Sequence, residues 1–251
     1  GMLKSGAVAP QDVWVYDHHK ENMAALQAEH PGVHEAESEE AAADAVEALG
    51  LAVKPHAVLP LISALSEGDR ELPLLISIAA AVTLDEMEER ACDGTRIVRA
   101  MPNTPCMVLS GVIAYSPGTA VTDEDEEAAR RLLSGCGSVF KVEESRMNAV
   151  SAISGCGPAY MFTALDALSD AGVAMGLPRK TALELAAGTM LGSALMLEQT
   201  GEHPMALRDA VTSPGGTTIA ALNALDECGF RNAWIQAVKS AVRRAEEMEG
   251  N

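Results

Sequence analysis

The feature that most constrains the fold is a change of pattern near residue 146. Before it, short apolar segments typical of strands alternate with helical patterns, and we expect strands near 12–17, 48–53, 72–81, 96–101, 111–116 and 138–142. Such alternation is typical of a mostly parallel sheet covered by helices. Beyond it no strand pattern recurs, and apolar residues repeat at helical spacing. The sequence therefore predicts an α/β domain over residues 1–145 and an all-α domain over residues 146–251.

A long apolar helix dominates the second domain. The helix expected from Pro178 to Gln199 is apolar nearly all round, and Gly188 and Gly192 would let a second backbone approach it closely. A helix of this kind is buried on several sides. It could form the interior of a monomer, but so small a helical domain buries it more easily when a partner subunit covers it. We therefore expect a homodimer or a larger homo-oligomer.

Charge and cysteine content exclude several classes of partner. The net charge is −18, from 36 acidic and 18 basic residues, and such a surface repels nucleic acid and anionic lipid. Five scattered cysteines without a C-x-x-C pair argue against a disulfide framework and a zinc site, so no metal is expected. No apolar run is long enough to span a membrane, and the first residues do not resemble a signal peptide. We expect a cytoplasmic protein that does not associate with membranes.

A turn rich in hydroxyl groups and glycine precedes another helical pattern. It reads Ser213-Pro214-Gly215-Gly216-Thr217-Thr218, and either threonine could cap the helix that follows. Unpaired N–H groups and the helix dipole at such a helix start favour a carboxylate or a phosphate. A simple capped turn between two helices is the alternative. We favour a pocket for a small substrate that bears a carboxylate.

The first domain lacks the glycine motif expected of dinucleotide-binding sheets. A Gly-x-Gly-x-x-Gly turn should follow the first strand, yet the only Gly-x-Gly strings are at 135–137 and 155–157, each without the third glycine. Asp17 ends the strand expected at 12–17, where a carboxylate could bind an adenosine ribose, although a solvated turn residue is the alternative. Lys54 ends the next strand at the sheet edge where ligands bind. His18 and His19 are expected to be solvated.

Four motifs together resemble the pyrroline-5-carboxylate reductase family. They are Ala52-Val53-Lys54-Pro55, Met101-Pro102-Asn103-Thr104-Pro105, Ser154-Gly155-Cys156-Gly157-Pro158-Ala159-Tyr160 and the segment 211–218. They occur in the family's order, and the resemblance extends from Met2 to about Glu246. It implies a Rossmann-like domain, here without its first strand and glycine turn, followed by a helical dimerisation domain. It also implies reduction of the C=N bond of 1-pyrroline-5-carboxylate to L-proline by a hydride from NADPH or NADH.

The resemblance also assigns candidate site residues. Those near the nicotinamide would be Ala52, Val53, Lys54, Pro55, Ala80 and Asn103. Those holding the substrate carboxylate and ring nitrogen would be Ser213, Gly215, Gly216, Thr217 and Thr218. Thr218 is the candidate catalytic residue, as the hydrogen-bond partner of the ring nitrogen. Asp17 would lie near the adenosine ribose, where its charge would repel the 2′-phosphate of NADPH and favour NADH.

Two other functions are consistent with parts of the sequence. A catalytically impaired paralogue or fragment could retain only the helical domain and act in assembly. A related dehydrogenase acting on a hydroxy acid would share the domain plan but would need a lysine base in the helical domain. Lys180 and Lys239 are the lysines there, and neither lies in a motif. We therefore favour the reductase.

Overall fold

The computed structural model describes residues 1–68 and 70–249, which form two compact units. The first unit comprises Gly1–Cys156 and the described residues from Ala241 onward. The second comprises Gly157–Ser240. The helical part of the chain already begins with η3 (Glu144–Arg146), α7 (Met147–Val150) and the π-helix η4 (Ser151–Gly155), which belong to the first unit. The boundary proposed from the sequence at residue 146 remains a prediction.

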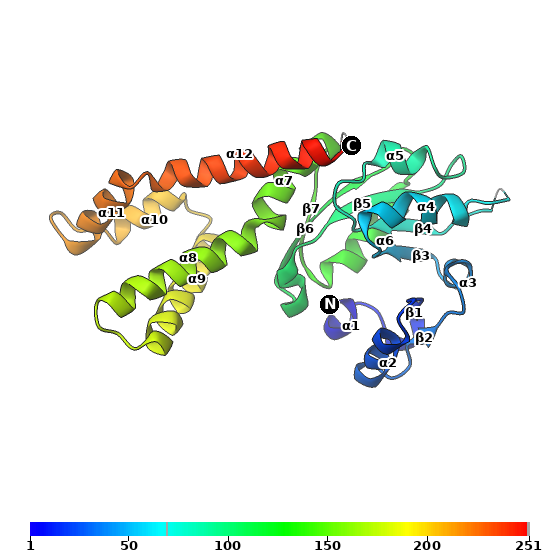
Figure 1. The fold of residues 1–251 in the computed structure, drawn as a ribbon, viewed down its shortest axis with the longest axis horizontal. Coiled ribbons are helices and arrows are strands. Elements are labelled where there is room, and N and C mark those ends of the chain that lie inside the picture. Colours follow the sequence, from blue (N-terminus) through cyan, green and yellow to red (C-terminus); the bar gives the residue numbers. More distant parts are fainter. Residues whose placement is uncertain (69, 250–251) are drawn as a thin grey trace. The chain divides into compact units, whose positions relative to one another are not determined.

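A five-stranded sheet forms the centre of the first unit (Figure 1). Its strands, in spatial order, are β3 (Ala48–Leu51), β4 (Leu74–Ser77), β5 (Ile97–Met101), β6 (Gly111–Pro117) and β7 (Gly137–Lys141). Only the β5–β6 pair is antiparallel among these. The prediction of a mostly parallel sheet is therefore confirmed.

A separate two-stranded sheet precedes it in the chain. Here β1 (Trp14–Val15) pairs in parallel with β2 (His34–Glu35), and neither strand is hydrogen-bonded to the larger sheet. Their surroundings are short helices: α1 (Met2–Ser5), η1 (Pro10–Asp12), α2 (Lys20–Glu29) and α3 (Glu39–Asp44). The strand expected at 12–17 is thus shorter than predicted. Strand β2 was not predicted, because a His-Glu pair has no apolar pattern and forms a strand only by pairing with β1.

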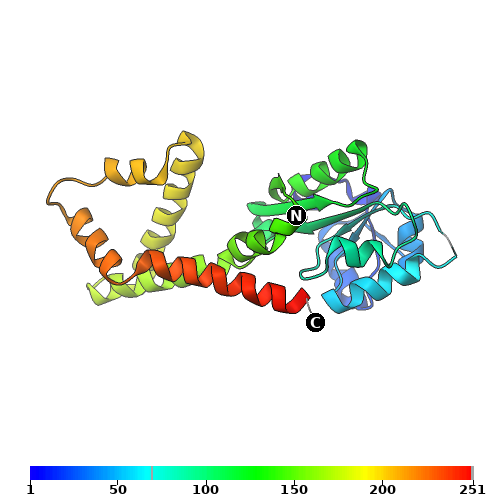
Figure 2. The same ribbon diagram turned by 90° about the horizontal axis from the view of Figure 1, so that it is seen from above.

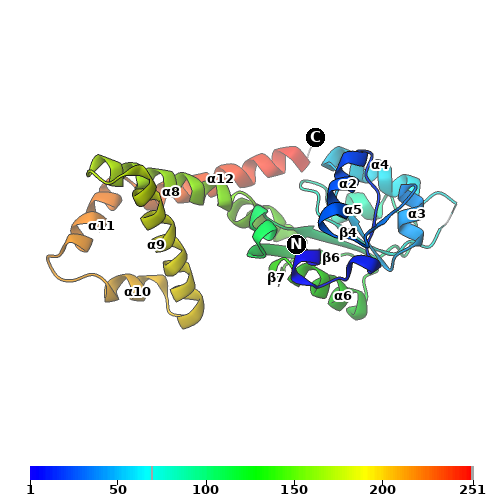
Figure 3. The same cartoon turned by 90° about the horizontal axis from the view of Figure 1, so that it is seen from below.

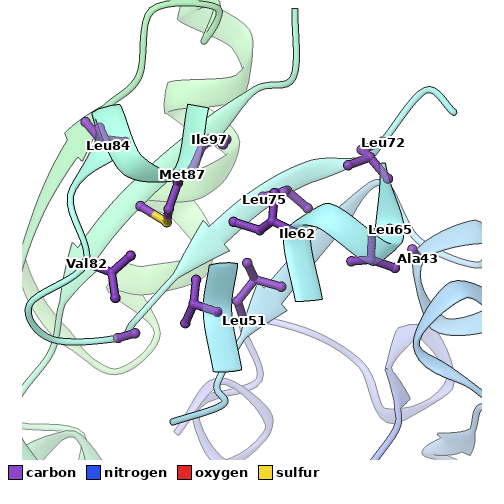
Figure 4. Packing of buried hydrophobic residues seen from close by; sticks show 12 residues of the cluster. Ala43, Leu51, Ile62, Leu65, Leu72, Leu75, Val82, Leu84, Met87 and Ile97 are labelled. Carbon is purple, nitrogen blue, oxygen red and sulfur yellow. The ribbon is translucent and has the colours of Figure 1, made fainter. Parts of the chain in front are cut away.

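Helices cover both faces of the five-stranded sheet. On one face, α4 (Pro55–Leu65) and α5 (Leu84–Glu88) pack on Leu51, Leu75 and Ile97 (Figure 4). On the other face, α6 (Asp123–Ser134) packs on Leu74, Ile76 and Val98. Successive residues of a strand point to opposite faces, so Leu74 and Leu75 enter different cores. Burial on both faces explains the unbroken apolar sequence of β4.

Capping boxes begin both α5 and α6. In α6, Thr122 accepts a hydrogen bond from the backbone N–H of Asp125, and the Asp125 carboxylate accepts one from the backbone N–H of Thr122. Asp125 also accepts from the Arg96 guanidinium at 2.8 Å, which links α6 to the start of β5. Burial opposes ionisation of Asp125, but the hydrogen bonds from Thr122 and Arg96 outweigh this effect and lower its pKa.

We expect Asp125→Asn to destabilise the protein by about 1–2 kcal/mol at neutral pH, because it weakens the cap and removes an ion pair. The pKa of Asp125 is lower in the folded state, so its stabilising contribution is complete above the unfolded-state pKa and is lost as the pH falls. The difference in unfolding free energy between the variant and the original protein should therefore narrow below about pH 4. Urea unfolding at several pH values measures it, and a difference that is constant with pH would contradict this account.

Glu144 joins three segments of the first unit. Its Oε1 accepts from the backbone N–H of Leu84 at 2.6 Å and from the guanidinium of the buried Arg99 at 2.9 Å. A buried guanidinium requires such compensation because removing it from water is costly. Glu144 therefore fixes the start of η3 to β5 and to the first turn of α5.

Five helices make up or enter the second unit: α8 (Gly157–Ala174), α9 (Arg179–Thr200), α10 (Pro204–Ala210), α11 (Thr217–Glu227) and α12 (Phe230–Glu249), which continues into the first unit (Figures 2 and 3). Helices α8 and α9 pack against each other through small residues. A Cβ placed on Gly172 would lie 2.9 Å from the Cβ of Ala182, so glycine is needed for this approach. Arg179 closes the α8–α9 turn by binding Ser169 and Asp170.

Large apolar side chains of the helical unit remain exposed in the single chain. Phe162 is 65% exposed, Met175 83% and Leu191 62%. The sequence had indicated that α9 would be buried on several sides, yet only Ala182 and Ala186 of this helix are buried. Exposed apolar side chains gathered in one region are typical of interaction sites and of ligand-binding grooves.

None of the helices in the described part of the chain is long and apolar enough to cross a membrane.

Candidate functional site

Several predicted cofactor residues lie at one edge of the five-stranded sheet. Strands β3, β4 and β5 run parallel, so their carboxyl ends meet at the same edge. The residues that follow these strands there are Ala52, Val53, Lys54, Pro55, Ala80 and Asn103, which we call the strand-end edge. Ligands of open α/β sheets bind outside the carboxyl ends of the strands. The structure therefore brings together residues that are distant in sequence at a position suited to a ligand.

The β3–α4 connection is short and preorganised. Lys54 is the N-cap of α4, and Pro55 occupies its first position, where a missing N–H removes no hydrogen bond. Ala52 and Ala80 are exposed and small, and Val53 is 38% exposed. Small exposed side chains leave room for a flat ring against the ends of the strands. Ala81 next to them has φ +57°, a conformation that is rare outside glycine and is often found at functional sites.

The Asn103 side chain joins two of the sequence motifs. Its Nδ2 donates to the carbonyl oxygen of Ser154 at 3.0 Å, and its Oδ1 accepts from the backbone N–H of Val112 at 2.9 Å. Beside it, a Cβ placed on Gly155 would lie 2.8 Å from the Cε of Met101. The amide of Asn103 thus holds the loop after β5 against the π-helix η4, and π-helical turns are frequent at functional sites.

We expect Asn103→Ala to lower the free energy of unfolding by roughly 1–3 kcal/mol, because the Val112 N–H and the Ser154 carbonyl each lose a partner. Thermal and urea unfolding would measure the loss. Asn223→Ala, at an exposed position of α11, is a control for the general effect of removing an amide side chain. We call the two hydrogen bonds of the Asn103 amide, to Ser154 and Val112, the Asn103 clamp. Equal stability of Asn103→Ala and the original protein would contradict a stabilising role for this clamp.

Asp17 lies beside a pocket at the carboxyl ends of β1 and β2. This β1–β2 pocket, of about 500 Å³, is lined by residues that include Tyr16, Asp17, Lys20, Glu35 and Glu37. Asp17 accepts from the backbone N–H of His19 at 2.8 Å and from the side-chain amide of Asn22 at 2.7 Å. These two hydrogen bonds lower the pKa of Asp17. Glu35 and Glu37 were not predicted, because β2 was not.

The turn at 213–216, in the helical unit, has the geometry that its sequence suggests. Gly216 N–H donates to the carbonyl of Ser213 at 3.1 Å, and Gly215 has φ +69°. Proline at the second position and glycine with positive φ at the third are typical of a type II turn. We call residues 213–216 the proline–glycine turn. It leads directly into α11.

The predicted threonine cap of α11 is wrong. The N-cap is Gly216, and it makes no side-chain cap hydrogen bond, whereas Thr217 and Thr218 are the first two helical residues. The turn ends at Gly216, and the helix begins directly with the two threonines, so neither of them occupies the capping position. The backbone N–H groups of the first turn therefore have no side-chain cap, and they form the positive end of the helix dipole.

His18 and His19 are exposed, as expected. His19 pairs with Asp17, while His18 pairs with Glu39 and Tyr16. Within the described residues, no three His, Cys, Asp or Glu side chains are arranged to hold a metal ion.

These features define a class of protein. A mostly parallel sheet whose β3, β4 and β5 strand ends meet at one edge, followed by helices with exposed apolar side chains, is typical of dinucleotide-binding oxidoreductases with a helical association domain. Comparisons with known proteins agree. Residues 144–248 match the family described as pyrroline-5-carboxylate reductase dimerisation, and residues 1–81 match NADP oxidoreductase coenzyme F420-dependent.

Full-length relatives identify the family. The pyrroline-5-carboxylate reductase of Escherichia coli (strain K12) is 38% identical over 248 residues, covering 99% of this chain and 92% of the relative. That of Methanosarcina acetivorans is 39% identical with the same coverage. A solved structure of a pyrroline-5-carboxylate reductase from Coxiella burnetii has a TM-score of 0.90 and 32% identity, covering 98% of this chain and 94% of the other. The chain belongs to the pyrroline-5-carboxylate reductase family.

Another relative has been solved with a cofactor bound to it. The Plasmodium falciparum pyrroline carboxylate reductase, solved with NADP bound, has a TM-score of 0.87 and 28% identity over 99% of this chain and 92% of that one.

Proposed function

We propose that this protein reduces the ring C=N bond of 1-pyrroline-5-carboxylate to L-proline, using NADH or NADPH. The observation that carries this proposal is the match to curated reductases along 99% of the chain, with all four motifs in order. The strand-end edge and the start of α11 support it, because each has the chemistry that one of the two reactants requires.

The start of α11 suits the substrate carboxylate. Uncapped N–H groups at Thr217 and Thr218 and the helix dipole favour an anion. Ser213, with its hydroxyl, is the first residue of the proline–glycine turn, and Gly215 and Gly216 place no side chain over the helix start. Thr218, on the first turn, is the proposed hydrogen-bond partner of the ring nitrogen.

The strand-end edge suits the nicotinamide. The cofactor supplies a hydride to the imine carbon, and the protein has to hold the two reactants in line. A protonated imine already carries the positive charge that attracts the hydride, so no strongly perturbed acid or base is required. Ala52, Val53 and Ala80 are exposed and apolar, and catalysis then arises from positioning and fixed dipoles.

A second copy of the chain is the proposed partner of the helical unit. The exposed apolar side chains on α8 and α9 would be removed from water if a partner buried them. This region also matches the family model described as dimerisation. The free cysteines support a reducing compartment such as the cytoplasm.

Turnover with purified protein tests the proposal. The reaction should consume NADH or NADPH only when 1-pyrroline-5-carboxylate is present and should yield L-proline, detected by mass spectrometry. Cofactor binding without any turnover would favour the catalytically impaired paralogue. Turnover of a hydroxy acid in its place would favour the related dehydrogenase.

A further inference from the structure

The β1–β2 pocket presents fixed negative charge. Parallel β1 and β2 both end at this pocket, which is the position where such folds bind the adenosine ribose. The carboxylates of Asp17, Glu35 and Glu37 line it, together with the imidazole of His18 and one ammonium group, that of Lys20. No arginine is present among the described residues that line it.

Asp17 is held in place before any ligand binds. His19 contacts Oδ1 through its backbone N–H and, at 3.2 Å, its ring Nδ1, whereas Asn22 donates to Oδ2, which keeps a second lone pair. Asp17 can therefore still accept a hydrogen bond from a ribose hydroxyl. It cannot rotate away from an approaching anion without breaking both contacts.

A ribose 2′-hydroxyl and a 2′-phosphate would have opposite effects in this pocket. The hydroxyl donates to a carboxylate, whereas the phosphate adds about two negative charges to a pocket that already has an excess of them. Arginine is the side chain that normally accommodates a 2′-phosphate. The Plasmodium falciparum relative was solved with NADP bound, so the family fold does not itself exclude the phosphate. Any discrimination between NADH and NADPH must therefore come from the residues that line the β1–β2 pocket.

We propose that Asp17, with Glu35 and Glu37, makes this protein select NADH over NADPH by repelling the 2′-phosphate. This inference rests on the proposed function for its cofactor, but it concerns binding and can be tested without turnover. Lys20 lies at the first position of α2, where it offsets only part of the charge.

Titration of the purified protein with NADH and with NADPH tests this selectivity. We expect the dissociation constant for NADPH to exceed that for NADH by about tenfold at low salt, and the ratio to fall as added salt screens the charges. Asp17→Ser should bring the ratio close to one, mainly by strengthening NADPH binding. Glu37→Gln, at an exposed position, should lower the ratio without risk to folding. Glu21→Gln, outside the pocket, is the charge-matched control and should leave the ratio unchanged.

Three results would overturn the proposal: equal or tighter binding of NADPH by the original protein, unchanged ratios in both pocket variants, or no binding of either cofactor. Failure of the proposed function gives a different result. In that case NADH binds more tightly than NADPH, but neither is oxidised by 1-pyrroline-5-carboxylate.

Discussion

Leu191→Arg is expected to dissociate the protein into monomers. Leu191 lies in the middle of α9 and is 62% exposed in the single chain, within the apolar surface that we propose a second copy covers. Each dimer would bury the new guanidinium twice without a partner. We expect a cost of at least about 3 kcal/mol, which raises the dimer dissociation constant at least about a hundredfold.

Sedimentation or light scattering over a range of concentrations would measure the change. Gln199→Arg introduces the same charge near the end of the same helix, at a position that is already polar, and should remain dimeric. Circular dichroism separates dissociation from unfolding. A Leu191→Arg variant that stays dimeric where the original protein is dimeric would show that another surface forms the interface.

The sequence predicted the strands that form the five-stranded sheet because their signals are local, although it did not separate the strand at 12–17 from them. Strand β4 has an unbroken apolar run, and the run of acidic residues after Thr122 marks the start of α6. The two-stranded sheet of β1 and β2 has no such local signal in both of its strands. Strand β2 is defined by its pairing with β1 and not by its own residues. The two carboxylates that follow it could not be recognised as pocket residues from the sequence.

The candidate site shows the same division between local and long-range information. Pro214 and Gly215 specify a type II turn through their own backbone preferences, so the shape of this turn was predictable. Which residue caps α11 depends on where the helix starts within a run of small residues, and that assignment was wrong. The clamp between Asn103 and Ser154 joins residues 51 positions apart, and no local pattern indicates it.

Thr218→Ala is expected to lower kcat/KM for 1-pyrroline-5-carboxylate roughly ten- to hundredfold, the effect of losing one oriented hydrogen bond to a charged group. Thr218 is the second residue of α11, where its hydroxyl is not used as a helix cap. The substitution should therefore change catalysis with little effect on folding. The loss should appear mainly in kcat if the bond orients the imine, and mainly in KM if it only holds the substrate.

Conservative variants distinguish the hydroxyl from the shape of the side chain. Thr218→Ser keeps the hydroxyl and should retain most of the activity, whereas Thr218→Val keeps the shape without the hydroxyl and should resemble Thr218→Ala. Both should bind NADH as the original protein does, because the cofactor is assigned to the strand-end edge. If valine supports the reaction as well as serine does, the hydroxyl makes no contact with the ring nitrogen. The backbone N–H groups at the start of α11 would then be the main contribution of this helix.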